Sequence, residues 1–171
     1  MPAWAITEAS VKALKAGDVI ELPIPPADKI MKLAFKSMID FTSGKAHWYM
    51  ITGTAEGEEE TIFVDFTEQV PDVSFVVKEL AQRDLKVNAQ TLEKFDAQGS
   101  GKITYDGKDY IYEDSDDVEF VDNGQKDVAT YFSFAVKRDD TDSILVFQWD
   151  EKTIEGFLLK SVNEKLVKVI Q

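Results

Sequence analysis

The chain has 171 residues, which is enough for one ordinary domain or two small lobes. Hydrophobic residues make up 44%, which excludes disorder over most of the length, because a disordered chain lacks the apolar surface that offsets conformational entropy. The 19 Lys and Arg against 32 Asp and Glu give a net charge of -13, which repels phosphate backbones and argues against a nucleic-acid ligand.

Several kinds of site and location are also excluded by composition. The chain has no cysteine, so disulfides, thiolate catalysis and Cys-ligated zinc are ruled out. The first residues lack the basic start and apolar stretch of a secretory signal, and no segment approaches the roughly 20 apolar residues of a membrane span. We therefore expect a cytoplasmic protein that does not insert into membranes, and no motif predicts a cofactor.

The N-terminal part mixes a short helix with strands. Thr7 is a candidate N-cap for the helix, and residues 18–22 are typical of a first strand. Residues 29–41 fit both an alternating strand and a helical stripe, and the turn that follows them favours the strand. Further strands are expected at 47–52 and 61–66.

The clearest helical pattern covers residues 73–84. Asp72, which follows a proline, is a candidate N-cap for this segment. Four apolar residues fall on one helical face: Val73, Val76, Val77 and Leu80. A second short helix is expected at 89–95, after a cap at Asn88.

Beyond residue 98 the pattern changes to short strands joined by tight turns. Asp106-Gly107 and Asn123-Gly124 are typical of two-residue hairpin turns. The expected strands cover residues 103–105, 109–112, 118–120, 129–136, 144–149, 154–160 and 166–170.

These elements together predict the fold class. We expect an α+β fold, with antiparallel β-meander sheets in two lobes, one main amphipathic helix at 73–84 and further short helices. Residues 1–171 are interpreted as a single domain. Its subdivision would be an α+β lobe at 1–98 and a mostly antiparallel β lobe at 99–171, since the glycine-rich segment at 99–101 is the only break in composition.

One segment, residues 92–104, resembles an EF-hand calcium loop with its entering helix. Asp96, Gln98 and Ser100 occupy the first three ligand positions. The twelfth position, where a bidentate acid completes the coordination shell, is Gly107. We therefore predict no calcium binding, with Asp96, Gln98 and Ser100 as the weak candidates for metal ligands.

Negative charge is densest at residues 106–122, which hold eight acids and one base, Lys108. Packed carboxylates repel one another and are relieved by positive charge, so this run can bind a cation or a basic partner, or simply form a solvated hairpin edge. The candidate partner-binding residues are Asp114, Asp116, Asp117, Glu119 and Asp122. A second acidic tip is formed by Glu56, Glu58, Glu59 and Glu60.

The candidate chemistry leaves two functions open. His47 is the only histidine and no nucleophile motif accompanies it, so we expect an exposed or edge-strand residue and no catalytic set. The first hypothesis is a non-catalytic acidic binding or accessory protein that docks on a basic protein, for example an immunity-like inhibitor. The alternative is a carboxylate-dependent or divalent-metal-dependent hydrolase that uses the 106–122 cluster, which requires its carboxylates to converge in a pocket.

The C-terminal half carries three short motifs: Tyr105-Asp106-Gly107-x-x-Tyr110, then Glu113, and later Gln148-Trp149-Asp150. In these it resembles bacterial families known only as domains of unknown function. The resemblance implies a small accessory protein, in some cases encoded beside genes for phage-shock-like membrane-stress proteins. It supplies no catalytic residues.

Overall fold

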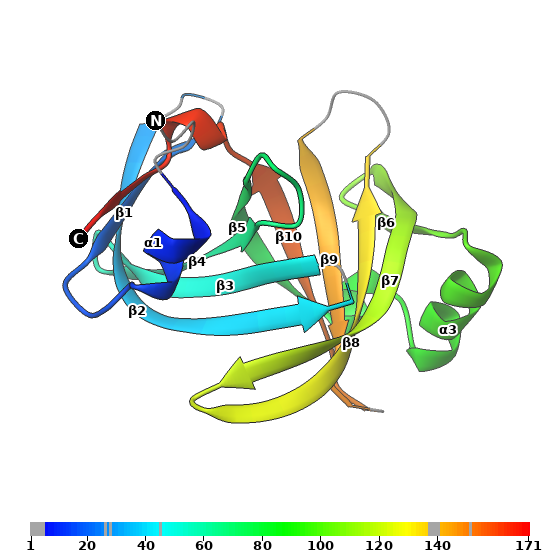
Figure 1. Cartoon of the computed structure of the whole chain (residues 1–171). Helices are drawn as coiled ribbons and strands as arrows, with labels where there is room; N and C mark the ends of the chain where they lie inside the picture. The colour runs from blue at the N-terminus through cyan, green and yellow to red at the C-terminus, as the bar shows by residue number, and fades with distance from the viewer. Residues whose placement is uncertain (1–5, 26, 28, 45, 137–140, 151) are drawn as a thin grey trace. The chain divides into compact units, whose positions relative to one another are not determined.

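The computed structural model describes residues 6–25, 27, 29–44, 46–136, 141–150 and 152–171, which form eleven strands and only short helices (Figure 1). By their contacts the residues divide into two compact units. Unit 1 comprises residues 1–75, 121–125 and 161–171, and unit 2 comprises residues 76–120 and 126–160. Residues 1–5, which entered the prediction that no secretory signal is present, lie outside the described part of the chain.

The elements follow one another with short connections. The first are α1 (Glu8–Lys12), β1 (Val19–Ile24), β2 (Lys29–Ser43), β3 (Ala46–Ala55), β4 (Glu58–Asp65) and β5 (Asp72–Ala81). They are followed by α2 (Gln82–Leu85), α3 (Ala89–Gln98), β6 (Lys102–Tyr105), β7 (Lys108–Asp122), β8 (Gln125–Ala135), β9 (Asp142–Gln148), β10 (Ile154–Ser161), the 3-10 turn η1 (Glu164–Leu166) and β11 (Lys168–Ile170). The strands pair in the order β11-β1-β2-β3-β4-β5-β10-β9-β8-β7-β6.

The predicted α+β class is therefore wrong. The protein is mostly β, with one large antiparallel sheet where two lobes with a main amphipathic helix were expected. Residues 73–84, the predicted main helix, form most of β5 and the beginning of α2. The longest helix in the described residues is α3, with 10 residues.

The helical spacing in β5 has a different origin. Val73 is buried in the core of unit 1, whereas Leu80 is buried in the core of unit 2. Successive residues of a strand point to opposite faces. Val73 is odd-numbered and Leu80 is even-numbered, so the two are buried on opposite faces of β5. A strand that changes its buried face along its length places apolar residues three and four apart, which is the spacing of a helix. Val77, assigned to the same helical face, is 49% exposed.

Unit 1 is built around the inner face of β1 to β5. Residues directly opposite each other in an antiparallel pair share a face, and three of the apolar pairs mark the centre of this core. They are Ile20 with Leu33, Ile51 with Ile62, and Val64 with Val73, all six of them fully buried. Ile6, which precedes α1, and Val11, which lies within α1, also belong to this core.

The strand β2 confirms the strand interpretation of residues 29–41 and bends strongly along its length (Figure 1). Its register with β3 shifts between Phe35 and Ser37, and an extra residue in one strand bends it and increases its twist. The same region needs a glycine on β3, because a Cβ at Gly53 would lie 2.3 Å from the carbonyl oxygen of Ala34.

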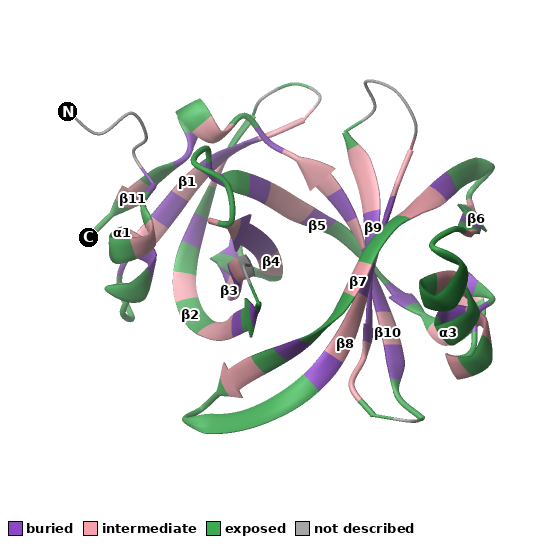
Figure 2. Ribbon diagram, turned by 45° about the vertical axis from the view of Figure 1, so that its right-hand side comes forward, coloured by how far each residue is buried: buried purple, intermediate pink, exposed green. Residues whose placement is uncertain are grey.

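In unit 2, β6 to β10 pair in chain order as a meander. The predicted turns at Asp106-Gly107, in unit 2, and at Asn123-Gly124, which is assigned with unit 1, are confirmed. All four residues have positive φ, between 50° and 80°. The helix predicted after Asn88 is also confirmed as α3, with the Asn88 side chain accepting from the Thr91 N–H at 2.8 Å. Figure 2 shows exposed residues along the tip of the β7–β8 hairpin.

Candidate functional site

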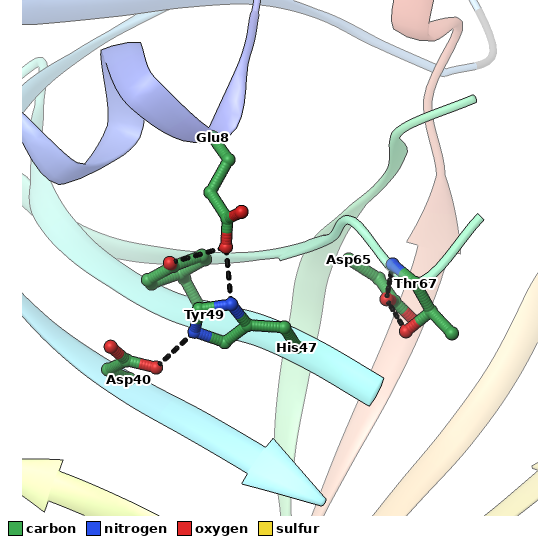
Figure 3. Close-up of polar contacts among 6 residues, drawn as sticks. All are labelled: Glu8, Asp40, His47, Tyr49, Asp65 and Thr67. Carbon is green, nitrogen blue, oxygen red and sulfur yellow. Dashed lines mark hydrogen bonds and ion pairs between the residues drawn. The ribbon is translucent and has the colours of Figure 1, made fainter. Parts of the chain in front are cut away.

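One polar network lies on the inner face of unit 1, where α1 meets β2 and β3 (Figure 3). Figure 3 shows the Glu8 side chain reaching from α1 to Nδ1 of His47, while Asp40 approaches the other side of the ring. The His47 Nε2 to Asp40 Oδ1 distance is 2.8 Å, and the Tyr49 hydroxyl donates to Glu8 Oε2 at 2.8 Å. His47 lies on β3 between β2 and β4 and its side chain is 30% exposed, so the expectation of an exposed or edge-strand residue is wrong.

The local structure fixes each member of this network. Thr7 caps α1 and its hydroxyl accepts from the Ser10 N–H at 3.1 Å, which sets Glu8 in the first helical turn. Asp40 and Tyr49 are directly opposite each other in the β2–β3 pair and therefore share a face. The Asp65 carboxylate in Figure 3 instead closes its own turn, by accepting from the Thr67 N–H at 2.8 Å.

The electrostatics of the network favour a structural tie. Both ring nitrogens of His47 face carboxylate oxygens, with Nδ1 against Glu8 and Nε2 against Asp40. Burial, the hydrogen bond to Glu8 and the charges of Asp40 and Glu8 raise the pKa of Tyr49 far above its ordinary value, so its hydroxyl stays protonated. Because each ring nitrogen is held against a carboxylate, neither is free to act as a general base.

A second region of unit 1 is a pocket of about 680 Å³, lined from β1, β2, the hairpin of β3 and β4, and β5. Its apolar lining includes Ile24, Ile30, Met31, Ala55 and Phe75. Its charged lining is Lys29, Lys32, Glu56, Glu58 and Glu60. Sequence reasoning missed this pocket, because the glutamates were interpreted only as an acidic tip.

The predicted partner-binding residues lie on β7. Asp114, Asp116, Asp117, Glu119 and Asp122 are all exposed. Two of them are held by β8: Asp114 accepts from the Tyr131 hydroxyl at 3.0 Å and Asp117 from the Thr130 hydroxyl at 2.9 Å. By the alternation of a strand, Asp114, Asp116 and Asp122 belong to one face of β7, and Asp117 and Glu119 to the other. Asp122 is assigned with unit 1 and the others with unit 2.

The predicted weak metal ligands lie at the end of α3. Asp96 is within the helix, where its carboxylate accepts from the Ser115 hydroxyl, and Gln98 is the last helical residue. Gly99, at φ 65°, ends the helix, and Ser100 follows it. In the part of the chain that the structure describes, no three or more His, Asp or Glu residues gather in an arrangement that could hold a metal ion.

None of the helices formed by the described residues is long and apolar enough to cross a membrane. The resemblance of the C-terminal half to uncharacterised bacterial families stays a prediction. No protein-family model, curated protein or solved structure matches the chain.

Proposed function

We propose that the chain is a non-catalytic binding protein that docks on a basic protein through the acidic segment, defined here as residues 113–119 of β7. One observation carries the proposal: five of these seven residues are acidic, none is basic, and all five acidic side chains are exposed. An exposed surface of one charge raises the rate at which an oppositely charged partner arrives and orients it.

The contacts of the acidic segment support a docking surface. Hydrogen bonds from Tyr131 and Thr130 hold Asp114 and Asp117, so these side chains lose little rotamer freedom on binding. Two neighbouring lysines direct their charge to other acids, with Lys102 Nζ 3.5 Å from Asp109 and Lys108 Nζ 2.9 Å from Asp142.

The same arrangement gives no support to the hydrolase alternative. A hydrolase that used the 106–122 cluster would need its carboxylates to converge on one substrate atom. On β7 they are spread along an extended strand, and Asp114 and Asp117 accept hydrogen bonds from the hydroxyls of β8. The proposal also includes a cytoplasmic location, and an immunity-like inhibitor of a basic protein is one form of it.

The test compares two variants with the same change of charge. Asp116→Asn combined with Glu119→Gln removes two charges from the acidic segment, while Glu68→Gln combined with Glu93→Gln removes two exposed charges elsewhere. The probe is a fluorescent peptide of alternating lysine and glycine, and its anisotropy is measured in about 20 mM and about 300 mM NaCl. We expect the segment variant to bind about three- to tenfold more weakly in low salt and the control variant to bind like the wild type.

Two results would overturn this proposal. If both double variants weakened binding equally, the probe would be responding to net charge and not to the acidic segment. If the higher salt left the affinity of the wild type unchanged, the contact would not be electrostatic, because salt screens exposed charges.

A further inference from the structure

The pocket in unit 1 has an unusual arrangement of charge on its inner wall. Along β4, Glu58 and Glu60 share a strand face with Ile62 and Val64, which are both fully buried. The cross-strand register agrees, since Glu60 is opposite Gly53 and Ile62 is opposite the core residue Ile51. Two carboxylates therefore continue an apolar face that otherwise forms the core.

The residue between these two glutamates behaves differently. Glu59 lies on the opposite face of β4, where its carboxylate is 3.0 Å from Lys36 Nζ. Among the described residues, neither the Glu58 nor the Glu60 carboxylate forms an ion pair or a side-chain hydrogen bond. Burial and the charge of Glu58 raise the pKa of Glu60. The outward carboxylate of Glu59 therefore has a cation partner, whereas the two carboxylates on the pocket side form no ion pair with the residues that the structure describes.

The apolar part of the pocket completes a site for an amphiphile. Leu22 is opposite Met31 on the inner faces of β1 and β2, and Phe75 is opposite Ile62 on β5 and β4. Pockets of a few hundred Å³ with apolar walls and a few charged groups are the usual form of a small-molecule site. The charged groups then decide which ligand the pocket accepts.

The charge balance of the lining favours a cation. Three glutamates face two lysines, and Lys32 is directed to the other face, with its Nζ 3.8 Å from Glu21. Lys29 alone is on the inner side of β2, opposite Ile24 of β1. Like charges on adjacent inward positions repel each other, and a ligand with positive charge relieves this repulsion.

We propose that this pocket binds a small amphiphilic cation, with its apolar body between Met31 and Phe75 and its ammonium group against the carboxylates of Glu58 and Glu60. The ammonium donates hydrogen bonds that a carboxylate accepts, and such charge-assisted bonds are the strong ones in a partly buried site. This site is independent of the proposed docking surface, because the two use different residues and either can fail alone.

The experiment uses three probes that share one alkyl chain: octylammonium, octanesulfonate and 1-octanol. Titration calorimetry of the full chain near neutral pH measures the affinity of each. We expect octylammonium to bind at least about tenfold more tightly than the other two. Glu58→Gln and Glu60→Gln should each weaken octylammonium binding about tenfold, because each removes one charged acceptor.

The matched control is Glu59→Gln, which changes the same residue type on the same strand but on the outer face. It should leave the affinity for octylammonium within about twofold of the wild type, and the same calorimetry on folded protein checks this. Equal binding of the three probes would overturn the proposal, as would no binding of octylammonium. An affinity that the Glu58 and Glu60 variants left unchanged would do so too.

Discussion

At the residue scale, His47 joins elements that are far apart in sequence. Its ring ties Glu8 of α1 to Asp40 of β2, and the hydroxyl of Tyr49 adds a bond to Glu8. Removing the ring leaves the carboxylates of Glu8 and Asp40 without the partner that they share, and a polar group that loses its partner is costly where water is partly excluded.

His47→Gln should therefore lower the free energy of unfolding by about 1 kcal/mol, a value reduced because Glu8 and Asp40 are about one-third exposed. Urea denaturation near neutral pH measures the change. Lys36→Gln is the comparison, since its ion pair with Glu59 is more than 60% exposed on both sides and should contribute less than about 0.5 kcal/mol. Equal losses for the two variants would contradict the structural part assigned to His47.

Glu60 supplies a prediction about pH. Burial and the charge of Glu58 raise its pKa, so the folded protein holds this proton more tightly than the unfolded chain does. The ionised carboxylate therefore lowers stability once the pH rises through its folded pKa, and this loss is absent at low pH. Glu60→Gln should be more stable than the wild type near pH 7 by about 0.5 kcal/mol, with no difference near pH 3.

Denaturant midpoints at the two pH values measure this effect, with Glu59→Gln as the control that shows no gain. The prediction also separates binding from folding. A variant that is more stable and yet binds octylammonium more weakly has lost a ligand contact and not its fold. A Glu60→Gln variant that is less stable near pH 7 would contradict the assigned burial.

The sequence predicts these sites only in part. His47 stands out as the sole histidine, but its partners Glu8 and Asp40 come together only through the packing of α1 and the pairing of β2 with β3. The pocket had a detectable signal, because Glu58 and Glu60 alternate in step with apolar Ile62. A local cluster of glutamates is typical of an exposed turn, and this interpretation hid the alternation.

At the scale of the element, the strands and turns are predicted well where the signal is local. The hairpin turn at Asn123-Gly124 needs positive φ at both residues, and asparagine followed by glycine adopts it at low cost. The segment at 73–84 fails because its apolar spacing depends on two cores that the strand reaches in turn. Valine-rich composition there favours a strand, and this preference outweighs the helical spacing once β4 is present to pair with it.

Gly53 on β3 supplies a prediction for the bulged region of the sheet. A Cβ at this position would lie 2.3 Å from the carbonyl oxygen of Ala34 and 2.9 Å from the Leu33 side chain. Gly53→Ala should lower the free energy of unfolding by about 1–3 kcal/mol, because backbone has to move to admit the methyl group. Thr54→Ala, at the exposed neighbouring position, is the control in the same denaturation experiment. An equal midpoint for the two variants would show that β2 yields without cost.

The end of α3 concerns calcium. Asp96 is part of the helix and accepts from the Ser115 hydroxyl, so its carboxylate is engaged within the protein. We expect millimolar calcium to leave the melting temperature unchanged in both the wild type and Asp96→Ala. A rise in melting temperature with calcium that disappeared in Asp96→Ala would contradict this, because a ligand that binds only the folded state stabilises it.

At the scale of the whole molecule, the order of the strands is beyond what local pattern predicts. β5 is followed in the sheet by β10, and β1 lies beside the C-terminal β11. Both pairings join residues far apart in sequence, and many strand orders are compatible with the same set of alternating segments. Unit 1 likewise combines three separate stretches of chain, which no change of composition marks.

The net charge of -13 gives a prediction for the whole molecule. Folding brings the acids closer together than they are in the unfolded chain, so their mutual repulsion opposes the compact state. Raising NaCl from about 20 mM to about 300 mM shortens the Debye length and should raise the melting temperature by about 2–4 °C. The ion pairs act in the opposite direction, but most have a partner that is well exposed and contribute little. Asp116→Asn combined with Glu119→Gln should therefore melt at a higher temperature in low salt and respond less to NaCl. A melting temperature of the wild type that falls with salt would mean that attraction between opposite charges, and not repulsion among the acids, dominates the stability of this fold.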